Sequence, residues 1–460
     1  MTRRLRSGIA LGLAASLILS ACGGDDNADN DTGGTTGGGS SPEAPADLDY
    51  AALGLWDDGA CDESKPPLIV GTQTVFESPV ISLGDVAVAL EAAGEAFNKR
   101  GGVNGSCIQV ITCDDKANLD AAVNCARDLD DKGVQVVVND LVTAGASEVA
   151  GVLSGAGIPR VATNLTPGNY DDDMAFPLNA SSSGAVFLLP KGLVESGINK
   201  IGILRPDLSE SAIMQSLFEQ VYGADGAEFV SDAPVASGTT DYTQYILSAS
   251  DAGAEGVVIA TGEQEAVQLV KAGQQLVKAG QQLATDLKFG ISLGTFSHKN
   301  VTDLGDTAEQ MVFVGAFPPA TMDVPVYEVL RADLAASGDD RLQPDTLKTS
   351  AQQSWIGLYA TIKMLRDANV TDSSRENVTA AIRAAKDVPM LGIFGDETWT
   401  PDVQIEGLFA RPGIPTWGIY SWNPDAEAPD GLSGNFEETT TVDFVDILCG
   451  TPLGAPAETC

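Results

Sequence analysis

Histidine is nearly absent from this sequence, since His298 is the one histidine among 460 residues. A metal site made of several histidines is therefore excluded, and a Ser-His-Asp triad must use His298. We interpret His298 as a surface or cleft-lining residue rather than a catalyst. The cysteines lack close Cys-x-x-Cys spacing, so we expect no metal cluster. We also expect no cofactor.

Basic residues are also scarce, with 26 Lys and Arg against 64 Asp and Glu and a formal net charge of −38. Nucleic acid and anionic lipid surfaces are therefore poor partners. We interpret the excess of acids as a solvated surface suited to a saline medium; the alternative is electrostatic steering of a cationic ligand. The sequence has no GxxxxGK[ST] motif, so ATP hydrolysis must reside in another chain.

Long apolar runs are limited to the beginning of the chain. Arg3, Arg4 and Arg6 precede an apolar stretch from 9 to 19, which is shorter than the roughly 20 residues of a membrane span. We predict a signal peptide over 1–22. Its last four residues, LSAC, resemble a bacterial lipobox, which implies that Cys22 becomes the mature amino terminus and carries a lipid. The alternative is an ordinary thiol.

The segment after the signal peptide is rich in Gly, Asp, Asn, Thr and Ser and has no apolar periodicity up to about Asp47. Such a composition predicts a flexible tether, which we extend over 23–65. Coil scaling gives this tether a reach of roughly 35 Å. The chain is therefore expected to be anchored to a membrane and not to span it.

The stretch from Phe97 to Thr143 predicts the fold class. Apolar runs at 107–112 and 134–138 flank a segment whose apolar residues have helical spacing: Leu119, Ala122, Val123, Ala126 and Leu129. A strand, helix and strand of this length indicate a parallel pair with a right-handed crossover, and hence an α/β protein. Ligands of such sheets lie beyond the carboxyl ends of the strands, here 114–115 and 139–143.

A second lobe follows, because 460 residues exceed what one hydrophobic core usually covers. Strands are expected at 200–204, 228–230, 256–260, 287–291 and 311–316, with helices at 242–249 and in other intervals. The chain should cross back near Pro318 and Pro319, form helices over 324–337 and 349–368, and end in a closing hairpin over 391–422.

Several segments occur in an order that resembles a known family: NKRGGVNG, a strand, DD, a helix, KGVQVVV, GAGIPRVATN, LGIFGDETWTPDVQ and WGIYSWNPD. The resemblance covers nearly all of 66–425. It is to extracytoplasmic solute-binding proteins of the branched-chain amino-acid type, which serve ABC importers. It implies a type I periplasmic binding fold, in which two Rossmann-like lobes with parallel sheets are joined by three crossovers. The first lobe would comprise 66–181 and 319–390, the second 182–318 and 391–448, and 449–460 a tail.

The expected binding site lies where strand-end loops of both lobes meet. Free N–H groups at the helix start after Thr143, with its hydroxyl, suit an anionic group, although a plain helix cap by Thr143 is an equal alternative. The resemblance implies that hydroxyls at Thr143 and Thr166 hold a ligand carboxylate. The predicted ligand-binding residues are Thr74, Phe76, Thr143, Ala144, Asn164, Thr166, Glu210, Thr261, Glu263 and Leu293.

The second lobe departs from the amino-acid binders of this family. They carry an acidic residue at the position of Leu293 and aromatic residues at the positions of Glu210 and Gly262. We therefore do not expect an ordinary aliphatic α-amino acid as ligand. Glu210 or Glu263 could serve as the cation acceptor, and a surface role is the alternative for either.

If Cys22 carries a lipid, six cysteines remain, and export favours disulfides. Six cysteines allow 15 pairings. Cys113 ends a strand and Cys125 lies on the next helix, while Cys61 and Cys107 precede strands that should be neighbours. We predict these two pairs and a third, Cys449 with Cys460, in the tail.

The sequence LVKAGQQ occurs twice in succession, at 269–275 and 276–282. Seven residues are nearly two helical turns, so the duplication rotates the apolar face by only ~20°. We expect a protruding or locally broken helix without a function of its own; a partner-binding projection is the alternative.

These observations predict a non-enzymatic, monomeric solute-binding protein, anchored by lipid to the outer face of a bacterial membrane. It should bind a small polar molecule bearing a carboxylate or amide between its lobes and deliver it to an ABC permease with separate ATPase chains. The alternatives are a ligand-sensing receptor of the same fold and, least favoured, an extracellular hydrolase that uses His298.

Overall fold

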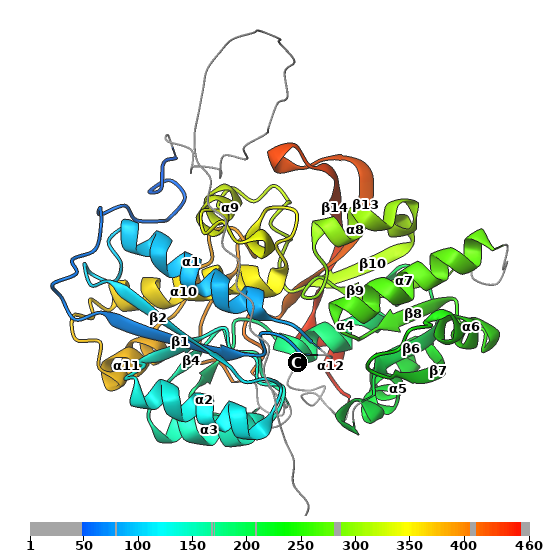
Figure 1. Cartoon of the computed structure of the whole chain (residues 1–460), viewed down its shortest axis with the longest axis horizontal. Helices are drawn as coiled ribbons and strands as arrows, with labels where there is room; N and C mark the ends of the chain where they lie inside the picture. Colours follow the sequence, from blue (N-terminus) through cyan, green and yellow to red (C-terminus); the bar gives the residue numbers. More distant parts are fainter. Residues whose placement is uncertain are drawn as a thin grey trace, which may run out of the picture. The chain divides into compact units, whose positions relative to one another are not determined.

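The structure is a computed structural model, and it describes residues 48–78, 81–166, 169, 171–207, 209–279, 287–404 and 411–451. The side chains of 181–183, 209 and 210 are outside this description. The described residues form two large sheets with helices packed on them (Figure 1). We call each sheet with its helices a lobe.

The first lobe has a parallel five-stranded sheet in the order β2-β1-β3-β4-β5. Its strands are β1 (Leu68–Thr74), β2 (Ile108–Asp114), β3 (Val136–Val138), β4 (Arg160–Val161) and β5 (Ala175–Phe176). The central strands are short apolar runs because helices cover both faces of the sheet. Within β3, Val136 and Val138 face one hydrophobic core and Val137 the other, as the two-residue period of a strand requires.

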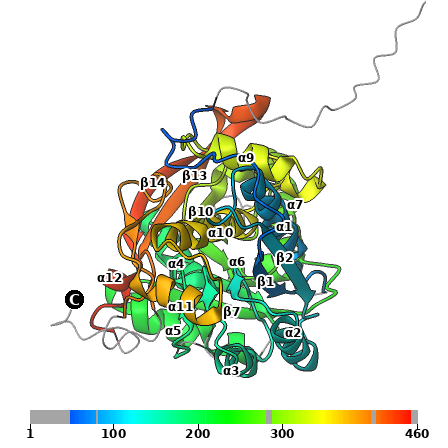
Figure 2. The same ribbon diagram turned by 90° about the vertical axis from the view of Figure 1, so that its left-hand side faces the viewer.

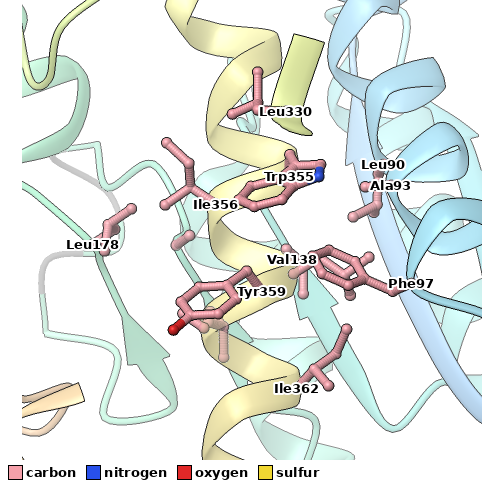
Figure 3. Packing of buried hydrophobic residues seen from close by; sticks show 14 of the residues in the cluster. Leu90, Ala93, Phe97, Val138, Leu178, Leu330, Trp355, Ile356, Tyr359 and Ile362 are labelled. Carbon is pink, nitrogen blue, oxygen red and sulfur yellow. The ribbon is translucent and has the colours of Figure 1, made fainter. Parts of the chain in front are cut away.

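Helices from two distant parts of the sequence cover this sheet. On one face are α2 (Leu119–Asp131) and α3 (Ala146–Gly155), and on the other are α1 (Gly84–Lys99), α9 (Tyr327–Ala335) and α10 (Thr349–Asp367). Figures 1 and 2 show α1 and α10 side by side. In the core between them, Trp355 of α10 lies against Phe97 of α1, and Tyr359 stacks on Trp355 (Figure 3). The helix α11 (Arg375–Ala384) packs against α10.

The second lobe has a seven-stranded sheet in the order β14-β13-β10-β9-β8-β6-β7. Its parallel strands are β6 (Lys200–Pro206), β7 (Glu228–Val235), β8 (Gly256–Ile259), β9 (Lys288–Ser292) and β10 (Met311–Gly315). Its helices are α4 (Ser181–Glu195), α5 (Met214–Tyr222), α6 (Thr243–Asp251), α7 (Glu263–Lys278), α8 (His298–Leu304) and α12 (Phe444–Leu448). The antiparallel strands β13 (Thr416–Glu427) and β14 (Ser433–Asp443) extend one edge.

The chain passes between the two lobes three times: after β5, after β10, and between β12 (Thr398–Trp399) and β13. The short strand β12 pairs with β11 (Val388–Pro389). Two α/β lobes joined by three passages are the predicted fold class, which the structure confirms.

The closing hairpin predicted over 391–422 is wrong in position. Residues 391–396 form consecutive turns, in which Gly392 and Gly395 have positive φ values of 76° and 61°. The hairpin instead consists of β13 and β14. The outer strand β14 was missed because its second half, EETTTVD, is polar and shows little apolar alternation. An edge strand with one solvated face needs no such alternation.

The tether predicted over 23–65 is too long, because residues 48–65 pack on the first lobe. Trp56 stacks on Phe97 and Tyr359 with ring centroids 5.6 and 5.9 Å apart, and the Arg366 guanidinium lies 4.7 Å from the centre of its ring. The apolar residues before Asp57 are the sequence signal for this docking. The predicted tether therefore shortens to 23–47, which lies outside the described residues.

Two disulfides fasten the first lobe, Cys61–Cys107 and Cys113–Cys125. Both are pairings that the sequence predicts. The parallel neighbours β1 and β2 bring Cys61 to Cys107, and Cys113–Cys125 joins β2 to α2. Cys449 is also disulfide-bonded. Its predicted partner Cys460 and the predicted lipid-bearing Cys22 lie outside the described residues.

The first LVKAGQQ copy lies within α7, which continues unbroken to Lys278 in the second copy. Leu269 and Leu276, which occupy the same position in the two copies, are both buried. The two copies therefore share one apolar face, because seven residues are nearly two helical turns. Gly280 and the rest of the second copy lie outside the described residues. The expected break or projection of this helix therefore stays a prediction.

Gly273→Ala in α7 is expected to destabilise the protein by about 1 kcal/mol, although alanine favours helix by up to about 1 kcal/mol. A Cβ at Gly273 would lie 2.8 Å from the Phe289 ring, which is buried in the second core. Overpacking of this kind costs about 1–3 kcal/mol and outweighs the propensity gain. Urea unfolding would measure the difference, and Gly151→Ala in α3, where a Cβ meets open space, is the control. A stabilised Gly273→Ala variant would contradict the prediction.

Candidate functional site

A cavity of about 760 Å³ lies between the two lobes. We call it the cleft. Its first-lobe residues are Phe76, Glu77, Ser78, Ser82, Gly84, Asp85, Asp340, Arg341, Thr346 and Lys348, and its second-lobe residues are Glu263, Gln264, Ser297, Lys299, Asn300 and Asp303. The first set comes from the β1–α1 loop, the start of α1 and the segment before α10, and the second from the start of α7 and from α8 with its N-cap. The cleft is large enough for a metabolite-sized molecule.

Local hydrogen bonds fix the loops that line the cleft. The Phe76 N–H donates to Asp114 Oδ1 at 3.0 Å, and the Ser78 hydroxyl donates to the Ile81 carbonyl at 2.8 Å. In the second lobe, Ser297 and Asn300 form a capping box that begins α8. Side-chain to backbone hydrogen bonds therefore fix both walls of the cleft.

Lys348 joins the two walls of the cleft. Its Nζ lies 3.3 Å from Asp85 Oδ2 in the first lobe and 2.9 Å from Glu263 Oε2 in the second. Burial disfavours the ammonium, but the two carboxylates outweigh it and raise the pKa of Lys348 above its usual value. Glu263 also accepts a hydrogen bond from Asn300 Nδ2 at 3.2 Å. An ion pair thus crosses from one lobe to the other at the cleft.

The other two cations of the cleft also have acidic partners. Arg341 Nη2 lies 2.7 Å from Asp339 Oδ2, and Lys299 Nζ lies 3.0 Å from Asp303 Oδ2. Five acidic and three basic residues line the cleft. The lining is therefore net negative.

A second polar cluster lies at the carboxyl ends of β3 and β4, around Asn139. Its Nδ2 donates to Ser354 Oγ at 2.7 Å, and its Oδ1 accepts from Asn164 Nδ2 at 3.1 Å and Gln353 Nε2 at 3.0 Å. Asn139 has a positive φ of 50°, which asparagine tolerates better than most residues. The cluster ties the strand ends of the first lobe to α10.

The structure brings two of the predicted site residues, Phe76 and Glu263, together at the cleft. Thr261 lines a separate cavity of about 40 Å³ in the second lobe. Thr74 and Leu293 are fully buried and do not line the cleft.

Four more predicted residues follow strands of the first lobe, and none of them lines the cleft. Thr143 is exposed and Ala144 half-buried, and Gly145 rather than Thr143 is the N-cap of α3, without a side-chain cap. Asn164 belongs to the Asn139 cluster, and the Thr166 N–H donates to Asn169 Oδ1 at 2.8 Å. The side chain of Glu210 lies outside the described residues. Roles for these residues in binding stay predictions.

The sequence reasoning missed Asp85 and Lys348. Asp85 carried a usable signal, because it is an acidic residue in the first turn of the helix that follows the β1 loop. Lys348 gave no such signal. It precedes α10 as its N-cap residue, and its partners lie far away in the sequence, in both lobes.

His298 is buried, so the expectation of a surface or cleft-lining histidine is wrong. It is 4% exposed, its Nε2 lies 2.9 Å from the Gly434 carbonyl, and its ring packs edge-on against Trp422. Burial lowers the pKa of His298. Among the described residues no group of three or more His, Cys, Asp or Glu side chains could hold a metal ion. No described helix is both long and apolar enough for a membrane span.

Asp115 follows β2 and is fully buried, and burial, with the nearby Asp114 and Asp140, raises its pKa to about 6. A raised carboxyl pKa means that the folded state holds the proton more tightly than the unfolded chain does. The resulting stabilisation is present below about pH 4 and is lost as the pH rises through 6.

Asp115→Asn is therefore expected to be more stable than the unaltered protein at pH 7.5, by about 3 kcal/mol, and equally stable at pH 4. Asparagine retains the oxygen that accepts from the Ala117 N–H. Thermal unfolding across this pH range measures the gap, and Asp120→Asn, at an exposed site, is the control. A gap that does not depend on pH would refute the titration.

Comparison with known proteins agrees with this geometry. A family model described as periplasmic binding protein matches residues 70–407. No curated protein matches the chain.

Solved structures share the fold. A solute-binding protein of an ABC transporter from R. palustris, in complex with 4-hydroxybenzoate, has 18% identity and a TM-score of 0.65, with coverage of 82% of this chain and 97% of that one. A fatty acid ABC transporter substrate-binding protein from Thermomonospora curvata has 14% identity and a TM-score of 0.65, with coverage of 84% and 95%. At these identities the likeness establishes the fold alone. The family match over most of the chain establishes more: this chain belongs to the periplasmic binding protein family.

Proposed function

We propose that this protein is the solute-binding component of an ABC importer and binds a small polar molecule in the cleft. The observation that carries the proposal is the cleft itself, because both lobes line it and the Lys348–Glu263 ion pair crosses it. Three passages between lobes allow a hinge motion, and a solute that contacts both walls favours the closed form by its additional contacts there.

Delivery of the solute requires partners that this chain does not supply. The sequence has no phosphate-binding loop for ATP, so hydrolysis belongs to separate ATPase chains beneath a permease. We propose that the family's extracytoplasmic location takes the form of lipid attachment at Cys22. The shortened tether of 23–47 then has a reach of roughly 25 to 30 Å, enough for the body to dock on a neighbouring permease.

We propose lobe boundaries at 181/182, 318/319 and 390/391. The first falls at the start of α4, the second after β10, and the third before β12, ahead of the passage to β13. The carboxylate or amide expected on the solute depends on Thr143 and Thr166, which do not line the cleft. The charge of the solute is therefore better judged from the cleft residues themselves.

A solute titration tests the proposal. The protein is heated with a broad panel of amino acids, amides, organic acids and amines, and each stabilising compound is then recovered and analysed by mass spectrometry. A compound present at 100 times its Kd adds about 2.7 kcal/mol of stability, and it should be recovered unchanged. Chemical turnover of the bound compound, or no stabilisation by any member of the panel, would refute solute binding of this kind.

A further inference from the structure

The charge of the cleft indicates what kind of solute it takes. Five carboxylates and three cations line it, so it carries an excess of two negative charges. The whole chain has the same sign, with a net charge of −38. An anionic solute would add to a charge already in excess, whereas a cation would reduce it.

The three cations of the cleft are committed to acids of the protein. Lys348 is shared between Asp85 and Glu263, Arg341 is held by two contacts to Asp339, and Lys299 pairs with Asp303 four residues along α8. A solute carboxylate could bind one of them only in competition with its present partner. The cleft therefore offers no uncommitted positive charge among its lining residues.

Some acidic side chains of the cleft, in contrast, have no cationic partner in the protein. The carboxylates of Glu77 and Asp340 form no ion pair or hydrogen bond with any described residue, and Glu77 is exposed to the cavity. Glu263 faces them from the second lobe and keeps about a third of its side chain exposed despite its contact with Lys348. Asp85 is 2% exposed and pairs with Lys348, so it is less accessible to a solute than Glu77 is.

We infer that the solute carries an ammonium or guanidinium group, which binds between Glu77 of the first lobe and Glu263 of the second. The inference rests on the proposed solute-binding function and specifies the class of solute. Such a cation contacts a carboxylate from each lobe and so stabilises the closed form, while Asp85 keeps Lys348 neutralised beneath it. The excess negative charge of the chain would also speed the approach of a cation.

The test uses two matched sets of compounds on the purified protein. The cationic set is arginine, agmatine, 1,4-diaminobutane, spermidine and choline. The other set has no ammonium or guanidinium group and is 4-hydroxybenzoate, octanoate, glutarate, 3-methylbutanoate and acetamide. Thermal shifts identify binders and calorimetry gives their Kd values. At least one cationic compound should bind, and its affinity should fall as NaCl is raised from 50 to 500 mM.

Variants separate a local contact from a general charge effect. Glu263→Gln and Glu77→Gln should each weaken binding of that cation at least tenfold. Glu77 forms no ion pair or hydrogen bond with a described residue, and it acts on Arg341 through space. Glu265→Gln removes the same charge from the same turn of α7 but does not line the cleft, so it should change the Kd less than twofold.

Two results would overturn the inference. If anionic or neutral compounds bind and no cationic compound does, the inference is refuted but the solute-binding function stands. The same holds if Glu263→Gln and Glu265→Gln weaken binding of the cation equally. If no compound of the broader panel binds either, the proposed function fails with it.

Discussion

Arg160→Met is expected to lower the free energy of unfolding by about 3–5 kcal/mol, the usual cost of removing one partner from a buried ion pair. Arg160 is fully buried, with its Nε 3.0 Å from Asp140 Oδ2 and its Nη1 2.9 Å from Asp172 Oδ2. Burial opposes its charge, but the two carboxylates outweigh this and raise the pKa of Arg160. Methionine fills similar space and leaves both carboxylates buried without a cation.

Urea unfolding at pH 7 measures this loss, and two controls define its cause. Arg383→Met breaks a partly exposed pair with Asp173, so it should cost less than about 1 kcal/mol. Adding Asp172→Asn to Arg160→Met should recover part of the loss, because one of the uncompensated charges is then absent. A loss below 1 kcal/mol for Arg160→Met would show that the pair contributes no net stability.

Trp355→Ala is expected to cost about 3–5 kcal/mol, because it empties the centre of the first-lobe core. The Trp355 side chain is fully buried between Phe97 and Tyr359, with ring centroids 5.2 and 6.1 Å away (Figure 3). Its Nε1 donates to Asp333 Oδ2 at 2.8 Å. The substitution therefore removes packing and also one donor from a buried carboxylate that pairs with Arg100.

Trp355→Phe divides these two contributions. Phenylalanine keeps an aromatic ring in the core but has no N–H for Asp333, so we expect a loss of about 1–3 kcal/mol, the cost of an unsatisfied buried acceptor. Chemical denaturation of both variants gives the comparison. If the phenylalanine variant loses as much stability as the alanine variant, the hydrogen bond and not the packing dominates.

The sequence was sufficient for those parts of the fold that depend on local periodicity. The segment from Cys107 to Val138 has short apolar runs on both sides of a helical repeat, and this pattern determines a parallel unit whatever surrounds it. The two disulfides followed from it, because neighbouring strands bring Cys61 to Cys107, and the helix that follows the second strand brings Cys125 to Cys113. The polar strand β14 could not be recognised, since its pairing with β13 and not its own pattern makes it a strand.

The cleft was harder to predict because its contacts are not local. Lys348 and Glu263 are 85 residues apart and belong to different lobes, and Asp85 is still farther from Lys348 along the chain. A single sequence shows that these three residues are charged, but not which of them form ion pairs with one another. The position of Glu263 directly after β8 was enough to suggest it as a cation acceptor. In the structure Glu263 lines the cleft.

The docking of residues 48–65 on the first lobe has a mechanical consequence. Trp56 stacks on Phe97, and Cys61 forms a disulfide with Cys107, so residues 48–65 move with the first lobe. A force applied to the chain before residue 48 therefore acts on the first lobe and not directly on the segments that join the lobes. With the lipid anchor that we propose at Cys22, the first lobe would be the restrained one, and hinge closure would move the second lobe relative to it.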